Sequence, residues 1–444
     1  MGRKFDFETR QAPIMSLTTE RRLTTVLSWR TLRRRRQYPL SSAETKLANM
    51  LTSELKGLLY GRELDSPVVK VVRALSGHGA VSTSQIARNT GLARSTVSTI
   101  LADLKRSNLV IEMEARNPGP GRPAVAHSLN PEAGTCVGAL LDVDEIRVIV
   151  ADVAHNVVAD LAMPVEREYS PTKAARVVKH AVDTLYKEHS LAQASLIGIG
   201  FAVSAPLAPD GRIMRSSALP GWQGTDFREA FEPVLQKPIF ADSESNCAAL
   251  AEMMWGAASG CSDFVLLKLN QAVSGAVVVD GRALVGASGS AGEMGHIVID
   301  PHGPLCRCGN RGCLELYCGA GFVSKMAADW LGRSIPVTEI VTRAVQGETG
   351  FRRLIGDAGE AAGRGLSMVG AMVNPPLFII SGTLAGAGEL LLAPLRASYE
   401  KHSFVKREDV DEAHYPVFRA GKFLDNDNCL GAAGLVLRHS SRLK

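Results

Sequence analysis

Four side chains that bind soft metal ions lie close together in one stretch of the sequence. They are one histidine and three cysteines: His296, Cys306, Cys308 and Cys313. Thiolate sulfur and imidazole nitrogen are the ligands that close a tetrahedral structural zinc site. Glycines alternate with these cysteines and let a short loop turn back on a small ion. The spacing predicts a structural Zn²⁺ site; the alternative is a set of buried or reactive thiols beside an unrelated histidine.

Two carboxylates bracket this loop. Glu293 lies three residues before His296, and Glu315 lies two residues after Cys313. A metal ion with four nitrogen and sulfur ligands needs neither of them. Carboxylates held beside such a loop are suited to accept hydrogen bonds from the hydroxyls of a polyol or sugar. The alternative is that both are solvated acids on the surface.

The charge of the chain is unevenly distributed. The 444 residues are 45% hydrophobic, which is enough for two or three domains with cores of their own. Residues 1–65 carry 13 Lys and Arg against 7 Asp and Glu, residues 66–130 carry 8 against 3, and residues 131–444 carry 29 against 35. The net charges are therefore +6, +5 and −6. A basic front part on an acidic body predicts a polyanionic partner for the front part alone.

The sequence contains no apolar run long enough to span a membrane, and its first twenty residues lack the apolar core of a signal peptide. We therefore expect a cytoplasmic protein without membrane association. In that compartment clustered cysteines indicate metal binding rather than disulfides.

Residues 1–65 are expected to form a basic N-terminal extension, largely disordered, with a helix near residues 43–60. The extension contains four consecutive arginines, Arg33 to Arg36. Such a run can contact phosphates without sequence preference or can remain a solvated tail, and the sequence leaves both open.

Residues 66–130 have the pattern of a winged helix-turn-helix domain. Apolar residues at helical spacing predict a first helix from Val68, a second over 82–89, and a third over 93–106 after a turn at Gly91. The third helix leaves polar side chains exposed where a recognition helix reads the major groove of DNA: Arg94, Ser95, Thr96 and Ser98. Residues 118–123 are expected to form the tip of the wing, where Arg122 is suited to a minor-groove or phosphate contact. The alternative is a helical protein-interaction domain.

Residues 131–444 alternate predicted strands and helices, which indicates an α/β fold of two lobes with a cleft between them. The strands are expected at 136–141, 146–152, 196–203, 264–269, 275–279 and 377–381, and the helices at 172–189, 247–258, 321–331, 337–346, 350–374 and 429–437.

The motifs of this region resemble those of the ROK family, which comprises repressors, open reading frames and sugar kinases. The resemblance rests on AGEMGH, CRCGNRGC and CLE in the metal loop, on LPGW at 219–222, and on the segments 242–252 and 279–282. The helix-turn-helix with its GRP wing resembles the N-terminal domain of the family's repressors. The resemblance implies a two-lobed actin-like (ribonuclease-H-like) fold that binds sugar in its cleft. It also implies that His296 contacts both zinc and sugar, and that Glu293 and Glu315 bind sugar hydroxyls.

Three departures from the kinases of the family concern catalysis. The first phosphate turn, which is Asp-Gly-Gly-Thr in the kinases, is the glycine-free stretch 141–146, where Asp144 and Glu145 would repel a nucleotide phosphate. The second, glycine-rich phosphate loop corresponds to 269–276 and retains only Gly275. Glu244 occupies the position of the kinase base, an Asp, and its longer side chain displaces the carboxylate. Two further departures, Ala218 and Gly319, fall among the positions that recognise sugar.

The sequence therefore predicts a DNA-binding transcriptional regulator, most readily a repressor of carbohydrate-metabolism genes, and not an enzyme. Operator DNA would bind residues 66–130, and a sugar effector would bind residues 131–444 at Glu293, His296, Glu315 and Glu244. Such repressors act as homodimers or dimers of dimers on symmetric sites. The alternatives are an ATP-dependent sugar kinase with an added DNA-binding module, and a regulator gated by a partner protein.

Overall fold

The computed structural model describes residues 55, 66–78, 80–114, 125–424 and 427–438. All of them belong to one compact unit, residues 46–444. The basic extension, most of the helix expected near 43–60, and the wing tip with Arg122 lie outside the described residues. Leu55, within that expected helix, is helical and fully buried.

The first described domain is a winged helix-turn-helix, as predicted. Its three helices are α3 (Pro67–His78), α4 (Thr83–Thr90) and α5 (Arg94–Arg106), and its strands are β1 (Val81–Ser82), β2 (Val110–Glu114) and β3 (Val125–Leu129). The antiparallel sheet has the order β1-β3-β2. Ser82 caps α4 by accepting the backbone N–H of Gln85. Gly91 ends that helix at φ +69°, a left-handed conformation that glycine adopts without strain.

The first lobe of the body is a five-stranded sheet in the order β6-β5-β4-β7-β8. Its strands are β4 (Thr135–Leu141), β5 (Glu145–Asp152), β6 (Val157–Pro164), β7 (Leu196–Val203) and β8 (Ile239–Ser243). β4, β7 and β8 run parallel, whereas β5 and β6 are antiparallel additions. One face of the sheet packs on α6 (Pro171–Glu188) and α7 (Phe227–Leu235), and the other packs on α14 (Asp427–Arg438).

The second lobe repeats this plan with the sheet order β11-β10-β9-β12-β13. Its strands are β9 (Phe264–Leu269), β10 (Val273–Val279), β11 (Arg282–Ala283), β12 (Leu377–Ser381) and β13 (Val417–Ala420). α8 (Glu244–Trp255) covers one face. The other face carries α9 (Glu315–Cys318), α10 (Ala320–Leu331), α11 (Val337–Val345), α12 (Thr349–Val373) and α13 (Glu389–His402).

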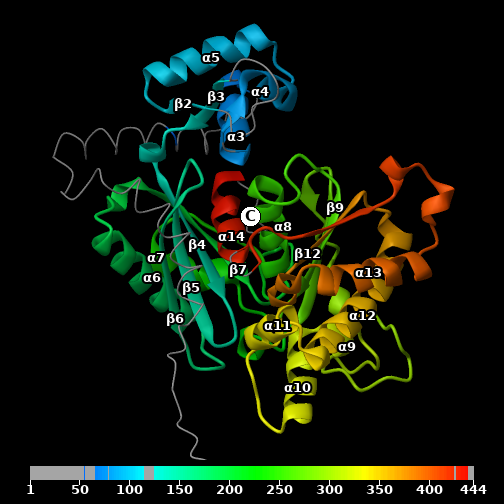
Figure 1. The fold of residues 1–444 in the computed structure, drawn as a ribbon. Coiled ribbons are helices and arrows are strands. Elements are labelled where there is room, and N and C mark those ends of the chain that lie inside the picture. The colour runs from blue at the N-terminus through cyan, green and yellow to red at the C-terminus, as the bar shows by residue number, and fades with distance from the viewer. Residues whose placement is uncertain (1–54, 56–65, 79, 115–124, 425–426, 439–444) are drawn as a thin grey trace, which may run out of the picture. The chain divides into compact units, whose positions relative to one another are not determined.

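α8 and α14 lie side by side between the two sheets, as Figure 1 shows. The approach is so close that a Cβ at Gly431 of α14 would lie 1.7 Å from the carbonyl oxygen of Cys247 of α8. On the sheet side of α14, a Cβ at Gly200 of β7 would meet the Ala432 carbonyl oxygen at 1.8 Å. Glycine is required at both positions because any side chain would push the helix away. Two lobes of like topology with these helices between them form the actin-like fold.

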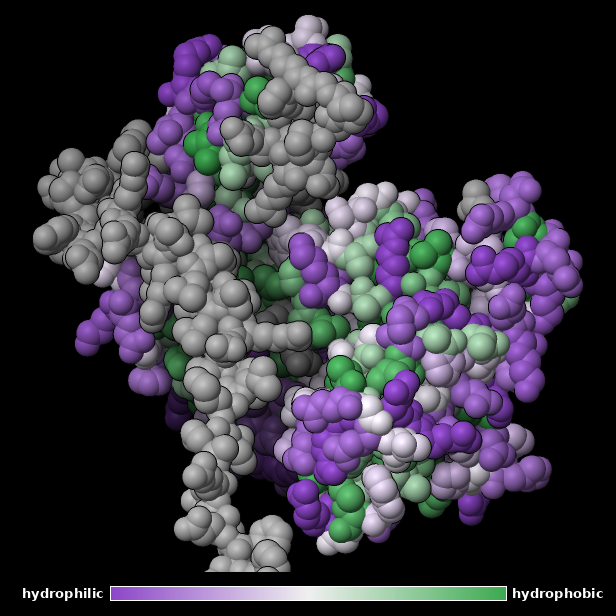
Figure 2. All heavy atoms as spheres, in the orientation of Figure 1, coloured by the Kyte–Doolittle hydropathy of each residue, from purple (hydrophilic) through white to green (hydrophobic). Residues whose placement is uncertain are grey.

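Hydrophilic residues cover most of the visible face of the second lobe, and hydrophobic ones form small separate patches (Figure 2). The exposed apolar side chains include Trp330 on α10 and Met372 on α12. Among the residues that the structure describes, no helix is long and apolar enough to cross a membrane.

Candidate metal centre and inter-lobe cleft

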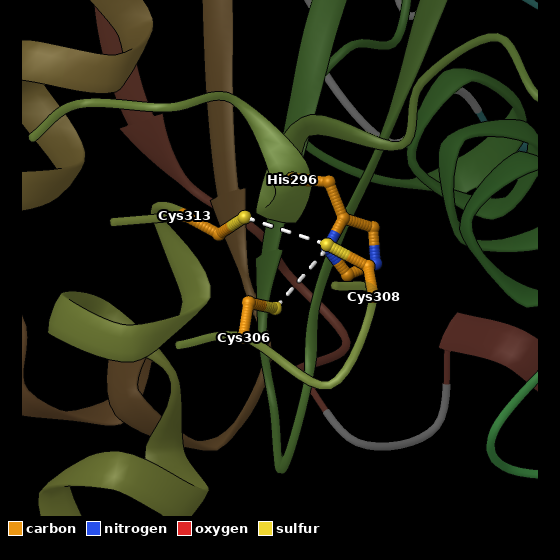
Figure 3. Close-up of side chains that lie close together, drawn as sticks. All are labelled: His296, Cys306, Cys308 and Cys313. Atoms are coloured by element: carbon orange, nitrogen blue, oxygen red, sulfur yellow. Dashed lines mark hydrogen bonds between the residues drawn. The ribbon is translucent and has the colours of Figure 1, made fainter. Parts of the chain in front are cut away.

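The four predicted metal ligands converge on one point (Figure 3). His296 ends a short 3-10 turn, Met294–His296, and the cysteines follow in the loop that leads to α9. One ligand atom from each residue lies within 4.8 Å of the other three. The Cys308 and Cys313 sulfurs are 3.6 Å apart, and Nδ1 of His296 lies 3.6 Å from the Cys306 sulfur.

The loop folds in this way because its backbone bonds to itself. The amide of Cys306 donates to the carbonyl of Asn310 at 2.7 Å, and Gly309 takes φ +98° within that turn. At Gly312, with φ +65°, a Cβ would lie 1.5 Å from the Asp300 carbonyl oxygen. Only glycine fits there, and it lets the backbone take the path that brings the three thiols close together.

The donor set fits a tetrahedral ion. With zinc–sulfur bonds of about 2.3 Å, two thiolates of a tetrahedral site lie about 3.8 Å apart. The separation of 3.6 Å between the Cys308 and Cys313 sulfurs is close to that value. The cluster can therefore hold a metal ion through His296, Cys306, Cys308 and Cys313.

The structure gives Glu315 a partner that the sequence did not reveal. Arg307, which lies between two of the cysteines, donates from Nε and Nη2 to both carboxylate oxygens at 3.1 and 3.0 Å. The Cys306 thiol donates to Oε1 of the same carboxylate at 3.0 Å. Glu315 is buried, so this paired guanidinium compensates a charge that would otherwise be costly. The nitrogen of His296 nearest to Glu315 is Nδ1, at 3.8 Å, which is the same nitrogen that faces Cys306.

Glu293 remains exposed at the edge of this group. Partial loss of hydration raises the pKa of its carboxyl, while His296 and Arg307 oppose the change. Glu293, His296, Arg307 and Glu315 thus form one cluster of charged and polar groups beside the metal ligands.

Glu244 belongs to a second cluster, at the carboxyl ends of the parallel strands β4, β7 and β8. The hydroxyl of Ser204, which follows β7, donates to Asp142 Oδ1 at 3.1 Å or to Glu244 Oε2 at 3.2 Å. Burial raises the pKa of Glu244 to about 7; Lys268 counters this, whereas Asp142 and Asp427 add to it. Carboxyl ends of parallel strands are where α/β folds bind ligands.

A buried ion pair lies close to this cluster, since both of its members act on the Glu244 carboxyl. Lys268 of β9 and Asp427, the first residue of α14, form an ion pair with both side chains fully buried. Nζ of Lys268 also donates to Asn428 Oδ1 at 3.0 Å, and the Ser381 hydroxyl of β12 donates to Asp427 at 2.5 Å. Since β9 and β12 belong to one lobe and α14 packs on the sheet of the other, the pair joins the two lobes.

The loops that correspond to the phosphate loops of the family's kinases make internal contacts. In the first, the Asp142 carboxylate accepts the amide of Val143 at 2.8 Å. In the second, Oδ1 of Asn270 accepts the amide of Thr383 at 2.9 Å. A Cβ at Gly382 would lie 2.7 Å from that oxygen, so the Asn270 side chain packs tightly over the loop after β12. The backbone amides of Val143 and Thr383 are thereby committed to side chains of the protein.

The side chains of α5 that were predicted to contact DNA lie on its exposed face. Arg94, Ser95, Thr96 and Ser98 are exposed, while Val97, Ile100, Leu101 and Leu104 are buried. The Ser98 hydroxyl donates to the Arg94 carbonyl at 3.0 Å, so reading a base would require it to rotate.

Comparison with known proteins places this architecture in a family. The ROK family model matches residues 137–439. The chain belongs to the ROK family. A second model, described as bacterial regulatory protein, arsR family, matches residues 65–112. The arsR-type match coincides with the three helices of the winged domain.

Relatives of this ROK protein include regulators and kinases. It is 26% identical over 327 residues to a xylose repressor of Bacillus subtilis, covering 74% of this chain and 84% of that protein. It is 23% identical over 384 residues to the transcriptional dual regulator NagC of Escherichia coli, covering 83% of this chain and 91% of that protein. Among solved structures, a ROK transcriptional regulator homologous to the E. coli MLC protein shares the fold with a TM-score of 0.66 at 18% identity, over 88% of this chain and 96% of that one. A ROK glucokinase from Streptomyces griseus, solved with glucose and AMPPNP, has a TM-score of 0.61 at 21% identity. The match covers 68% of this chain and 99% of that one.

The structure thus brings Glu293 and Glu315 together with the four metal ligands and places Glu244 in another cluster, and it adds partners that the sequence analysis missed. Arg307 could have been noticed, since it lies inside the metal loop. Lys268 is a lone charge in the apolar strand 264–269, and a buried charge must have a partner. Nothing in the sequence pointed to Asp427 as that partner.

Proposed function

We propose that this protein is a cytoplasmic transcriptional repressor of carbohydrate-metabolism genes. Its winged domain binds operator DNA as a homodimer or dimer of dimers, and a sugar bound in its ROK domain, braced by structural zinc, weakens that binding. The observation that carries the proposal is the exposed polar face of α5 in the same chain as a ROK domain whose first phosphate loop has no glycine and whose second has only Gly275. The names of the xylose repressor and NagC relatives support it.

We further propose that the ROK domain does not phosphorylate sugar. ATP needs a nest of backbone N–H groups free of nearby carboxylates. Here Asp142 and Asn270 occupy the amides of Val143 and Thr383, and Asp144 and Glu145 add negative charge to the first loop. The ROK glucokinase relatives make ATP hydrolysis with a panel of sugars the direct check of this point.

The effector site is proposed at Glu293, His296, Glu315 and Glu244. Carboxylates accept hydrogen bonds from sugar hydroxyls, and a zinc-bound imidazole is held in a fixed orientation by its metal. The sugar shifts the protein toward a state that binds DNA weakly only if it binds that state more tightly. Closure of the two lobes around the sugar supplies such a difference, because the ligand contacts both lobes only when they approach.

The carboxylates test the effector site. We expect Glu293→Gln and Glu315→Gln to bind operator DNA as the wild type does but to need roughly tenfold to a hundredfold more sugar for release. The reason is that a hydrogen bond to a charged acceptor contributes about 1.5–3 kcal/mol. His296→Gln should impair both DNA binding and the sugar response, because it also removes a metal ligand. The measurement is fluorescence anisotropy on an operator selected from random DNA, with xylose, glucose, N-acetylglucosamine and their phosphates as ligands.

Glu348→Gln is the matched control, since Glu348 is also paired to an arginine, Arg343 at 2.8 and 2.7 Å, but lies on the surface after α11. This variant should bind operator DNA and release it in response to sugar as the wild type does. If both cleft variants release DNA at the wild-type sugar concentration, the effector binds elsewhere, and gating by a partner protein becomes the better account.

We expect α5 to recognise the operator sequence and the wing to contact the DNA backbone. Ser95→Ala or Thr96→Ala should change the preferred operator sequence, because these side chains face base edges. Arg122→Ala should weaken binding to all sequences and lower the slope of log affinity against log salt by about one, as loss of one phosphate contact does. Arg396→Ala, which removes an exposed arginine of α13, is the control for charge. An unchanged salt slope for Arg122→Ala would reject the wing contact.

A further inference from the structure

The last turn of α3, in the DNA-binding domain, is bonded to the body at Ser76. α3 ends at His78, so the Ser76 carbonyl is among those that lack an amide partner in their own helix. Nε2 of His155 lies 2.7 Å from that carbonyl oxygen. The Ser76 hydroxyl can donate to the carbonyl of Leu437 in α14, at 3.2 Å, or to that of Arg73 in its own helix, at 3.1 Å. Ser76 is fully buried, so these bonds form away from water.

The chemistry of the groups fixes the direction of the bonds at His155. The indole N–H of Trp255 donates to Nδ1 of His155, and the two rings meet edge to face with centroids 4.7 Å apart. An indole nitrogen can only donate, so Nδ1 must be the acceptor. The proton of the neutral imidazole then resides on Nε2, which donates to the Ser76 carbonyl. Trp255, His155 and Ser76 therefore form a directed chain of hydrogen bonds, called the relay below.

The turn that carries His155 is itself held firmly. His155 lies between β5 and β6 at φ +74°. The Asp152 carboxylate, which is buried, accepts the amide of Asn156 at 3.0 Å and its side chain at 2.9 Å. The amide of His155 donates to the Asp152 carbonyl at 2.9 Å. The imidazole is thus presented by a tight turn of the first lobe.

Trp255 is the last residue of α8, and Glu244 in the cleft is its first. Eleven residue steps at 1.5 Å span about 16 Å. The helix is packed between the two sheets, beside α14 (Figure 1). Near its end, the buried Glu252 accepts the amides of Ala257 at 2.6 Å and Lys422 at 2.7 Å. A short helix so enclosed moves as a unit, so a displacement at Glu244 reaches Trp255.

We infer that α8 carries the effector signal from the cleft to the DNA-binding domain, and that Trp255 and His155 are the positioning residues through which it acts. The inference rests on the proposed function. In the state that binds DNA the relay is made and α3 is held against the body. Sugar in the cleft displaces Glu244 and the helix behind it, the relay opens, and α3 with the recognition helix loses its fixed placement. The relay is therefore a contact with two states, made and open. Sugar binding and DNA binding each shift the balance between these states.

Trp255→Phe tests the relay, because it keeps an aromatic ring but removes the N–H. Trp222→Phe is the matched control: its indole N–H also bonds a carbonyl, that of Tyr169 at 2.6 Å, but inside the first lobe. His155→Gln is the second variant. The full-length protein is used, with whichever of xylose, glucose or N-acetylglucosamine raises its melting temperature most. Sugar affinity is measured by calorimetry, operator affinity by anisotropy, and exchange of the α3 amides by hydrogen–deuterium exchange.

We expect Trp255→Phe and His155→Gln to bind the sugar within twofold of wild type. The ratio of operator affinities without and with sugar should fall at least fivefold, and the α3 amides should exchange faster even without sugar. Trp222→Phe should match wild type in all three measurements.

Two outcomes separate the relay from the proposed function. A wild-type sugar response and wild-type α3 exchange in Trp255→Phe would overturn the relay and leave the proposed function intact. Absence of any sugar binding by the wild type would overturn the proposed function, whereas faster α3 exchange in Trp255→Phe but not in Trp222→Phe would still establish that the relay holds the DNA-binding domain.

Discussion

Cys308→Ala is expected to lose stoichiometric zinc and to melt well below the wild type. Metal binding to a structural site of this kind contributes roughly 10 kcal/mol or more of apparent free energy, which is folding free energy of the loop it closes. That loop leads directly into α9 and Glu315, so its loss also removes the bidentate contact from Arg307. Operator affinity should fall with stability. The measurements are metal content by mass spectrometry and thermal unfolding with and without a chelator.

Cys318→Ala is the matched control for this variant. Cys318 is a buried thiol five residues after Cys313, and its sulfur faces the Leu314 carbonyl at 3.5 Å rather than the four-ligand cluster. It should keep its zinc and most of its stability. A fully folded Cys308→Ala protein, or a wild type that folds fully without zinc, would show that the metal does not brace this domain.

Lys268→Met is expected to destabilise the protein by about 3–5 kcal/mol, because it leaves the Asp427 carboxylate buried without its counter-charge. The substitution keeps the length and apolar stem of the side chain, so lost packing contributes little. The measurement is urea unfolding followed by tryptophan fluorescence. The lobes should also become easier to separate, because the pair joins β9 to α14.

The double variant Lys268→Met/Asp427→Asn should recover most of the lost stability, since it removes both charges and keeps an acceptor for the Ser381 hydroxyl. Arg353→Met, which breaks an exposed pair with Asp357 on α12, should leave the unfolding midpoint unchanged. A Lys268→Met variant no less stable than Arg353→Met would mean that the buried pair has no net stabilising role.

Local features of the sequence were enough to predict the metal loop and the DNA-binding domain. His296 and the three cysteines fall within eighteen residues, and a glycine-lined loop of that length has few ways to fold. The helices of the winged domain follow from apolar periodicity, and Ser82 caps α4 because its hydroxyl is next to the orphan amides. The buried strands β7, β9 and β12 have the expected limits because each is an almost wholly apolar run, interrupted in β9 only by Lys268.

Several helices and strands were not predicted from the sequence, or were given wrong limits, because the local features of their sequences favour different structures. α7 and α13 each contain a proline, Pro233 and Pro394, which weakens the helical pattern. β6 is an edge strand with exposed residues along it, and β8 is short. α8 begins at Glu244 rather than at Cys247, because Ser243 caps it by accepting the Asn246 amide. Because the helix starts three residues earlier than expected, Glu244 is its first residue and Trp255 is its last.

Which charged and polar groups meet was decided only by the tertiary structure. Lys268 and Asp427 are 159 positions apart, and Trp255 and His155 are 100 apart. Periodicity shows that Lys268 is on a buried strand but not which carboxylate enters the same space. That choice depends on how the two sheets pack on α8 and α14, where glycines such as Gly431 set the distance. The free energy of a buried charge depends on atoms within a few ångströms, and only the folded chain determines those neighbours.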